Sequence, residues 1–149
     1  MAYKVRKVKM LQKRVRDAAG VLAAEMQPFG EKAIDLEVVL GYPTEAGWAV
    51  VKALPANSRQ VMALKNSGFA DVPANQGGYL VVEGANKPGI AADIGAKIAA
   101  AGVSLSLFSA GAVGNQFSAL IGFNSGDDAT KAEKALTAKD TKPMRKKGK

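Results

Sequence analysis

Hydrophobic and polar positions follow different periods along the second half of the chain, and the changes of period predict its elements. Residues 79–84 are mostly β-branched or aromatic, which is typical of a strand. A turn containing Gly89 follows, and isoleucines then recur at every fourth position of residues 90–98. Because this spacing places apolar side chains on one helical face, it predicts a helix, which ends at Gly102.

Two further strands and a second helix are predicted beyond this point. Apolar and small polar residues alternate over residues 103–107, and apolar residues alternate again over 117–123, which is the pattern of strands. Residues 111–115 (Gly-Ala-Val-Gly-Asn) are typical of a hairpin turn. Residues 125–128 (Ser-Gly-Asp-Asp) form an N-capping cluster before a helix over 129–138. The predicted order is therefore strand, helix, strand, strand, helix.

The first half predicts the same order less clearly. The expected elements are a strand over 8–15, a turn over 16–20, a helix over 21–29, strands over 34–42 and 48–54, and a helix over 57–67 closed by Gly68. Pro28 should end or kink the first helix early, because proline cannot donate a backbone hydrogen bond and clashes with the preceding turn. The apolar residues from Val5 to Val15 would also fit one face of a helix.

A repeat of 69 residues relates the two halves without a gap. It pairs Gly20 with Gly89 and Trp48 with Phe117, and in general it matches turn with turn and apolar with apolar positions. Trp48 and Phe117 thus occupy equivalent hairpin positions, where large aromatic side chains are usually buried in a core. The same order of matched elements in both halves indicates a duplicated unit.

The duplication predicts an α+β fold: ferredoxin-like βαββα(β) units in two tandem copies that form a pseudo-twofold pair, with antiparallel sheets backed by helices. We expect a first domain over residues 1–70, a second over 71–138, and a basic, disordered tail over 139–149. A closing strand for each unit is not evident. Residues 79–84 could close the first unit, open the second, or do both.

Composition narrows the classes of function. The 149 residues include no Cys and no His, which excludes disulfides, thiolate nucleophiles, Cys/His zinc sites and imidazole acid–base chemistry. No catalytic triad, phosphate-binding loop, cofactor motif or metal-ligand cluster is evident, so we expect a protein without catalytic residues, metal or cofactor. No apolar run is long enough for a membrane helix, and no secretory signal is evident, so the expected compartment is the cytoplasm.

The net charge of +8 belongs to the two ends of the chain. Residues 1–16 carry seven basic and no acidic residues, residues 139–149 carry six basic and one acidic residue, and the stretch between them is mildly acidic. Basic termini of this kind would suit a nucleic-acid partner, whereas the blander interpretation of the C-terminal run is a solvated tail.

The turn between the first strand and first helix of each unit is the candidate for chemistry. A helix start presents unpaired N–H groups and the positive end of the helix dipole, which attract a carboxylate or phosphate. Gly89 lets a ligand approach the backbone, and the Asn86 carbonyl oxygen could accept a hydrogen bond from an ammonium group. These features suit a zwitterion, although Pro88 and Gly89 are also common at helix starts that bind nothing.

Residues 81–103 (VVEGANKPGIAADIGAKIAAAGV), followed by Ser104 and Leu105, resemble the ACT domain family. The signature of that family is a strand, Asp-x-Pro-Gly, a helix studded with Leu or Ile, Ala-Gly-Val/Ile, Asn-Ile and a hairpin. Residues 16–22 and 33–36 resemble parts of the same signature in the first half. The resemblance covers about residues 8–138 and is closest to tandem ACT-domain proteins.

The resemblance implies a module that binds small molecules, most often amino acids, at the interface between paired domains. The implied ligand contacts in the second copy are Asn86, Lys87, Pro88, Gly89, Ile90 and Ser104. Those in the first copy are Asp17, Ala19, Gly20, Val21 and Asp35.

Both copies depart from the family signature. The first copy lacks the proline, the second has Asn86 in place of Asp, and neither has Asn at the start of the second strand. Because Asp17 and Asp35 near one site would repel a ligand carboxylate, the second copy is the better candidate.

Together these observations predict a regulatory or sensor protein that is not an enzyme and binds a free amino acid or a similar small metabolite. A homodimer, or a partner enzyme or regulator, is the expected assembly, and no membrane partner is expected. The alternative is a nucleic-acid-binding protein that uses its basic termini.

Overall fold

The computed structural model describes residues 2–138, which form two compact units. We name the units by their position in the sequence. The inner unit is Lys9–Pro73, and the outer unit combines the residues on either side of it, 2–8 and 74–138. The structural division therefore differs from the one expected at residues 70 and 71, because residues 2–8 pack with the second half of the chain. The tail expected over 139–149 lies outside the described residues.

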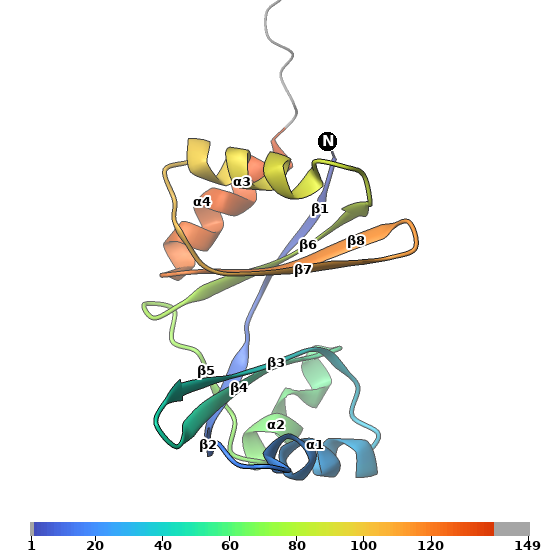
Figure 1. Ribbon diagram of the computed structural model, residues 1–149, viewed down its shortest axis with the longest axis vertical. Helices are drawn as coiled ribbons and strands as arrows, with labels where there is room; N and C mark the ends of the chain where they lie inside the picture. The colour runs from blue at the N-terminus through green and yellow to red at the C-terminus, as the bar shows by residue number, and fades with distance from the viewer. Residues whose placement is uncertain (1, 139–149) are drawn as a thin grey trace, which may run out of the picture. The chain divides into compact units, whose positions relative to one another are not determined.

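The inner unit has the order strand, helix, strand, strand, helix, strand (Figure 1). Its elements are β2 (Leu11–Arg16), α1 (Val21–Glu31), β3 (Leu36–Glu45), β4 (Trp48–Pro55), the 3₁₀ turn η1 (Ser58–Gln60), α2 (Val61–Asn66) and β5 (Ala70–Asp71). The antiparallel sheet runs β3-β4-β2-β5, and both helices cover one of its faces. This is the ferredoxin-like arrangement that the sequence predicts.

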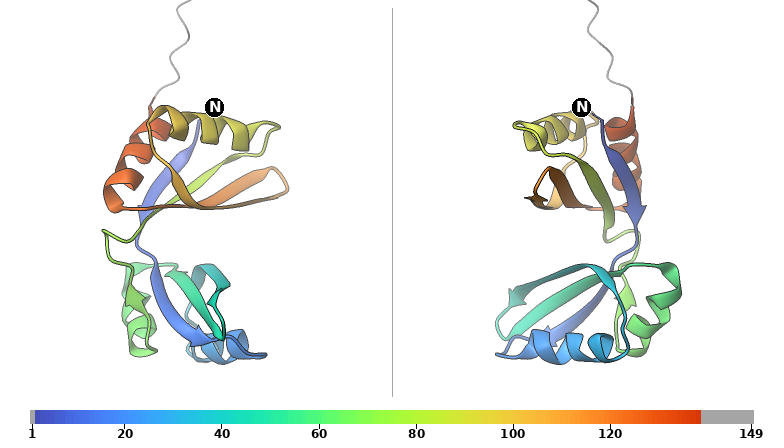
Figure 2. Two further views of the ribbon diagram at one scale, coloured as in Figure 1. Left: turned by 60° about the vertical axis from the view of Figure 1, so that its left-hand side comes forward. Right: turned by 90° about the vertical axis from the view of Figure 1, so that its right-hand side faces the viewer.

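The outer unit repeats this arrangement around a second sheet. Its elements are β1 (Lys4–Val8), β6 (Gly78–Ala85), α3 (Ile90–Ala100), β7 (Leu105–Val113), β8 (Gln116–Phe123) and α4 (Gly126–Thr137). The antiparallel sheet runs β1-β6-β8-β7, with α3 and α4 on one face (Figure 2). Buried Ile90, Ile94 and Ile98 confirm the isoleucine stripe as the core face of α3.

The strand predicted over residues 8–15 is wrong, because two strands of different units occupy this stretch. β1 pairs with β6, with Lys4 opposite Glu83 and Val8 opposite Tyr79, whereas β2 begins at Leu11 in the inner sheet. In the outer sheet β1 takes the edge position that two-residue β5 takes in the inner sheet. The two closing strands are thus β5 and β1, and residues 79–84 belong to the outer sheet alone.

The repeat holds, but its offset changes within the hairpin. Helices α1 and α3 start 69 residues apart, whereas β4 and β8 start 68 apart. The extra residue is Thr44, at an irregularity in β3 between the pairs Pro43–Ala49 and Glu45–Trp48. A one-residue slip moves a strand side chain to the other face of the sheet. Ala49, and not Trp48, is therefore the counterpart of Phe117.

This change of register explains the two aromatic residues. Phe117 is buried in the outer core, as predicted. The prediction that Trp48 is a core residue is wrong, because Trp48 is half-buried and carries the guanidinium carbons of Arg14 and Arg16 3.7 and 4.4 Å from its ring centre. Arg14 also forms an ion pair with Glu45.

Helix α1 runs to Glu31 rather than ending at residue 29. Pro28 lies in its last turn, and the Pro28 carbonyl still accepts a hydrogen bond from the Lys32 backbone N–H at 3.2 Å. Proline therefore removes a donor near the end of the helix without stopping it. No helix among residues 2–138 is both long and apolar enough to span a bilayer.

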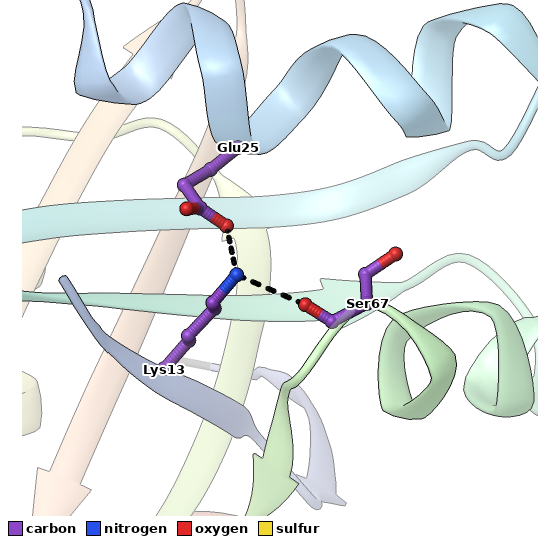
Figure 3. A network of polar contacts seen from close by, with 3 residues as sticks. All are labelled: Lys13, Glu25 and Ser67. Carbon is purple, nitrogen blue, oxygen red and sulfur yellow. Dashed lines mark hydrogen bonds and ion pairs between the residues drawn. The ribbon is translucent and has the colours of Figure 1, made fainter.

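An ion pair takes the place of core side chains in the inner unit. Lys13 and Glu25 stand at the positions that Val82 and Ile94, both fully buried, occupy in the outer core. The Lys13 Nζ lies 2.7 Å from Glu25 Oε1 and donates a 3.0 Å hydrogen bond to the Ser67 carbonyl oxygen (Figure 3). These contacts join β2, α1 and the end of α2. Both side chains are less than one-third exposed, so the ion pair is partly shielded from solvent.

Candidate ligand site at the strand–helix turns

The turns before α1 and α3 have the same backbone geometry. Gly20 and Gly89 both adopt left-handed conformations, with φ of +84° and +86°. Each turn is tied to the neighbouring hairpin by one hydrogen bond. The Asp17 N–H donates to the Gly47 carbonyl at 3.1 Å, and the Asn86 N–H donates to the Asn115 carbonyl at 2.7 Å. The duplicated turn that the sequence predicts is thus present in both units.

Neither helix start is capped by a side chain. The first N–H group of each helix donates to its own turn at 3.2 Å, from Val21 to the Ala18 carbonyl and from Ile90 to the Lys87 carbonyl. The next of these bonds run from the Ala24 N–H to the Gly20 carbonyl and from the Asp93 N–H to the Gly89 carbonyl. Such an uncapped start can receive an anionic group through its N–H groups and the positive end of its dipole.

The residues predicted for the outer turn divide into exposed and buried ones. Asn86, Lys87, Pro88 and Gly89 are exposed, which leaves their backbone open to a small molecule. Ile90 is only 5% exposed and packs in the outer core. Its side chain therefore stabilises α3 rather than facing solvent.

The inner turn borders a hollow of about 310 Å³. Of the predicted residues, Asp17 and Val21 line it, while Ala19 and Gly20 are exposed in the same turn. The hollow is lined by Val15, Asp17, Val21, Leu22, Val39, Gly41, Tyr42, Pro43, Ala49, Val50 and Val51. Most of these residues are apolar, and Asp17 and Tyr42 are the two that carry polar side-chain groups.

The structure does not bring Asp35 or Ser104 to the turn of its own unit. Asp35 lies beside Ala56, past the end of β4, whereas Asp17 lies beside Gly47 at the start of β4. At about 3.3 Å per residue, the eight residues of β4 separate these positions by roughly 25 Å. Ser104 has the corresponding position in the outer unit, since the adjacent Leu105 pairs with Phe123 at the far end of β8.

The corner of the outer unit that corresponds to the hollow is filled by side chains. Phe117, the counterpart of Ala49, and Ile90, the counterpart of Val21, are each 5% exposed. A Cβ atom added to Gly84 would lie 3.4 Å from Tyr3 Cδ1 and 3.9 Å from Ile90 Cδ1, so both side chains pack over this glycine. A uniform offset of 69 residues pairs Phe117 with Trp48 and so conceals this contrast in the sequence.

A signal for the correct pairing exists in the sequence. The capping residues Asn57 and Ser125 begin equivalent helical segments, and their side chains accept from the N–H groups of Arg59 and Asp128. These caps lie 68 rather than 69 positions apart. The shorter offset shows that the inner unit has one more residue than the outer unit between the turn and the cap.

The segment before β1 is anchored on α3 in the outer unit. The Tyr3 hydroxyl donates a hydrogen bond to Asp93 Oδ2, and Lys97 Nζ lies 3.1 Å from the same oxygen. These two contacts, the Tyr3 hydrogen bond foremost, hold the pKa of Asp93 below its ordinary value. The contacts explain why residue 3 lies over the outer corner.

The basic residues near the N-terminus are divided between the units. Lys4, Arg6 and Lys7 lie on β1 of the outer sheet, whereas Lys13, Arg14 and Arg16 lie on β2 of the inner sheet. Within the described residues, no group of three or more Asp or Glu side chains could hold a metal ion.

Comparisons with known proteins identify the fold. No protein-family model and no curated protein sequence matches the chain. A solved protein of Bacteroides thetaiotaomicron is similar over 86% of this chain and 87% of its own, with 18% identity and a TM-score of 0.68. The ligand-free regulatory subunit of aspartate kinase from Thermus thermophilus is similar over 91% and 95%, with 12% identity and a TM-score of 0.62.

A structure of aspartokinase alpha and beta subunits is also similar, over 91% of this chain and 95% of that one, with 17% identity and a TM-score of 0.55. The tandem, ferredoxin-like fold of ACT type that the resemblance implies is therefore confirmed. At these identities the similarity concerns the fold.

Proposed function

We propose that this chain is a regulatory protein without catalytic activity that binds a free amino acid at its strand–helix turns. The observation that carries the proposal is a hollow of small-molecule size beside the start of α1, which no side chain caps and whose turn contains Asp17. The fold shared with regulatory subunits of aspartate kinase supports the same class of function.

The proposed contacts follow from the charge of an amino acid. Its carboxylate binds the N–H groups at the helix start, where the helix dipole is positive. Its ammonium group binds an acceptor in the turn, either the Asp17 carboxylate in the inner unit or the Asn86 amide oxygen in the outer unit. The hollow favours the inner turn, with Asp17, Ala19, Gly20 and Val21, over the outer turn, with Asn86, Lys87, Pro88 and Gly89.

Calorimetric titration of the full chain with each of the twenty amino acids tests the proposal. We expect saturable heat for at least one of them. Substituting either turn glycine by valine should weaken binding at that turn, because a branched side chain blocks the approach to the helix start and is strained at positive φ. Titrations without saturable heat for any amino acid would contradict the proposed function.

We further propose that the chain forms a homodimer through the edge strand β7. Residues 104–115 contain no charged side chain, and β7 exposes Phe108 and Val113 along nine residues. The other sheet edges are protected in ways that oppose pairing. β1 carries three basic residues, β3 carries Pro43 and acidic residues, and β5 has only two residues.

Sedimentation velocity tests this assembly. The parent chain should sediment as a dimer, and Ser109→Lys at the middle of β7 should shift it to a monomer, because two lysines would face each other across a twofold axis. Thr44→Lys on the protected edge β3 is the control and should leave the dimer intact. A parent chain that remains monomeric would contradict pairing along β7.

A further inference from the structure

We infer that the inner hollow binds the apolar side chain of its amino-acid ligand, and that the outer turn has no pocket for such a side chain. The inference rests on the proposed function and adds to it a ligand class and a choice between the two turns. It is carried by the contrast between Ala49 and Phe117 at equivalent positions of the two central strands.

The hollow lies at one corner of the inner unit, where residues of β2, β3, β4 and the start of α1 line it. Its floor is formed by Val15, Ala49 and Val51 on β2 and β4, all 8% exposed or less. Its wall is formed by Val21 and Leu22 at the start of α1. In the outer unit the same corner contains the Phe117 ring, with Ile90 and Tyr3 packed over Gly84. The phenyl ring of Phe117 takes the place of the Ala49 methyl group, while its cross-strand partner is Gly84 in place of Val15. The outer unit therefore fills this corner from β8, and the inner unit leaves that part of it open.

The chemistry of the lining selects the ligand side chain. A polar or charged side chain placed against Val15, Val21 and Val51 would lose its hydrogen bonds to water without gaining partners, which is unfavourable in an apolar site. An aliphatic or aromatic side chain gains from the same contact. The volume of about 310 Å³ is at the lower end of the range for small-molecule pockets, so the hollow has room for an aliphatic or aromatic side chain.

The polar groups lie at one end of the hollow. Asp17 belongs to the turn, and α1 starts four residues later at Val21, so both can contact the charged groups of one amino acid. Leu22 and Val39, 54% and 43% exposed, lie at the rim and would cover an inserted side chain. Leucine, isoleucine, valine and phenylalanine are therefore the expected class, and aspartate, lysine and serine are excluded.

The test fills the hollow from inside. Calorimetry on the full chain should detect binding of at least one of the four apolar amino acids, and Ala49→Phe should weaken it about tenfold or more. In the outer unit the phenyl ring lies opposite Gly84, whereas Ala49 lies opposite Val15, so the thermal midpoint of Ala49→Phe is measured together with its affinity. Ser118→Phe, on the other face of β8 in the outer unit, is the matched control and should bind as the parent chain does.

A second variant guards against misfolding of Ala49→Phe. Leu22→Asp changes an exposed rim residue, so its thermal midpoint should remain near that of the parent, and its carboxylate should weaken apolar ligands to a similar extent. Unchanged affinity in folded Ala49→Phe, or binding of aspartate, lysine or serine alone, would overturn this inference and leave the proposed function standing. No binding of any amino acid would overturn both.

Discussion

The two units share one order of elements and one sheet topology, yet they use the space between sheet and helices differently. The outer unit fills it with Phe117 and the isoleucines of α3. The inner unit places Ala49 at one corner and the Lys13–Glu25 pair in the middle. A duplicated fold can therefore keep one copy as a densely packed support and open the other copy for a ligand, because backbone topology does not require a full core at every position.

The closing strands differ in the same direction. Five-residue β1 pairs along β6 and brings Tyr3 over the outer corner, whereas β5 pairs with β2 through Leu11 and Gln12 only. The outer corner is thus covered by a strand that comes from the other end of the sequence. The inner sheet has no strand of that length at its β5 edge, so the inner unit should be the less stable of the two.

Emptying the outer corner should produce the largest effect on this comparison. Phe117→Ala removes a buried ring and should lower the free energy of unfolding by about 3–5 kcal/mol, measured by urea denaturation. Trp48→Ala, at the half-buried position that a uniform offset would pair with Phe117, is the control and should cost less. Equal losses at the two positions would contradict the assigned register.

Breaking the ion pair should have the next largest effect. Lys13→Ala leaves Glu25, whose side chain is 17% exposed, without its cationic partner and should cost about 2 kcal/mol. The double variant Lys13→Val with Glu25→Ile copies the outer unit and should be neutral or stabilising, because apolar groups pack without desolvating charges. Urea denaturation of the single and double variants checks both expectations, and a double variant weaker than Lys13→Ala would show that the pair is required.

Substitution of the two turn glycines should destabilise the two units by equal amounts. Gly20→Ala and Gly89→Ala each force alanine into a left-handed conformation and should lose about 1 kcal/mol. Neither glycine has an atom near the position of the added Cβ, so sterics should not separate the two variants. Thermal denaturation measures both, and a cost at one turn alone would mean that their backbones are not equivalent.

Removal of the Tyr3 hydroxyl should have the smallest effect and should depend on pH. Tyr3→Phe deletes the main contact that lowers the pKa of Asp93, and it should cost up to about 1 kcal/mol at neutral pH. A carboxylate with a lowered pKa stabilises the fold fully above the ordinary pKa of aspartate, about 3.9, and this contribution is lost as pH falls through the lowered value. The variant and parent should therefore converge once the pH lies below the lowered pKa of Asp93, and a difference that persists at such acid pH would assign the effect to packing.

Features that depend on local patterns could be predicted from the sequence, whereas features that depend on register could not. The isoleucine stripe, the glycine turns and the duplication are visible because each repeats a local signal. The division of residues 4–16 between two sheets is not visible, because both strands are basic and β-branched and only tertiary pairing separates them. The irregularity at Thr44 had the largest effect on the comparison of the two units. This one extra residue in β3 shifts the repeat and conceals the equivalence of Ala49 and Phe117.

The candidate site illustrates the same limit. The turn residues Asp17 and Gly20 could be named from the sequence, and the structure places them beside the hollow or in the turn next to it. The preference for the second copy rested on repulsion between Asp17 and Asp35, which the structure places at opposite ends of β4. Charge repulsion falls off well within that separation at physiological ionic strength.

The most direct test of the difference between the units is a residue-resolved titration of the ¹⁵N-labelled chain with the apolar amino acids, followed by amide chemical shifts. We expect saturable shifts at Asp17, Val21 and Ala49, with the amides of Asn86, Gly89 and Phe117 unchanged. Shifts confined to the outer turn would show that the ligand binds where Phe117 fills the corner and would contradict the account.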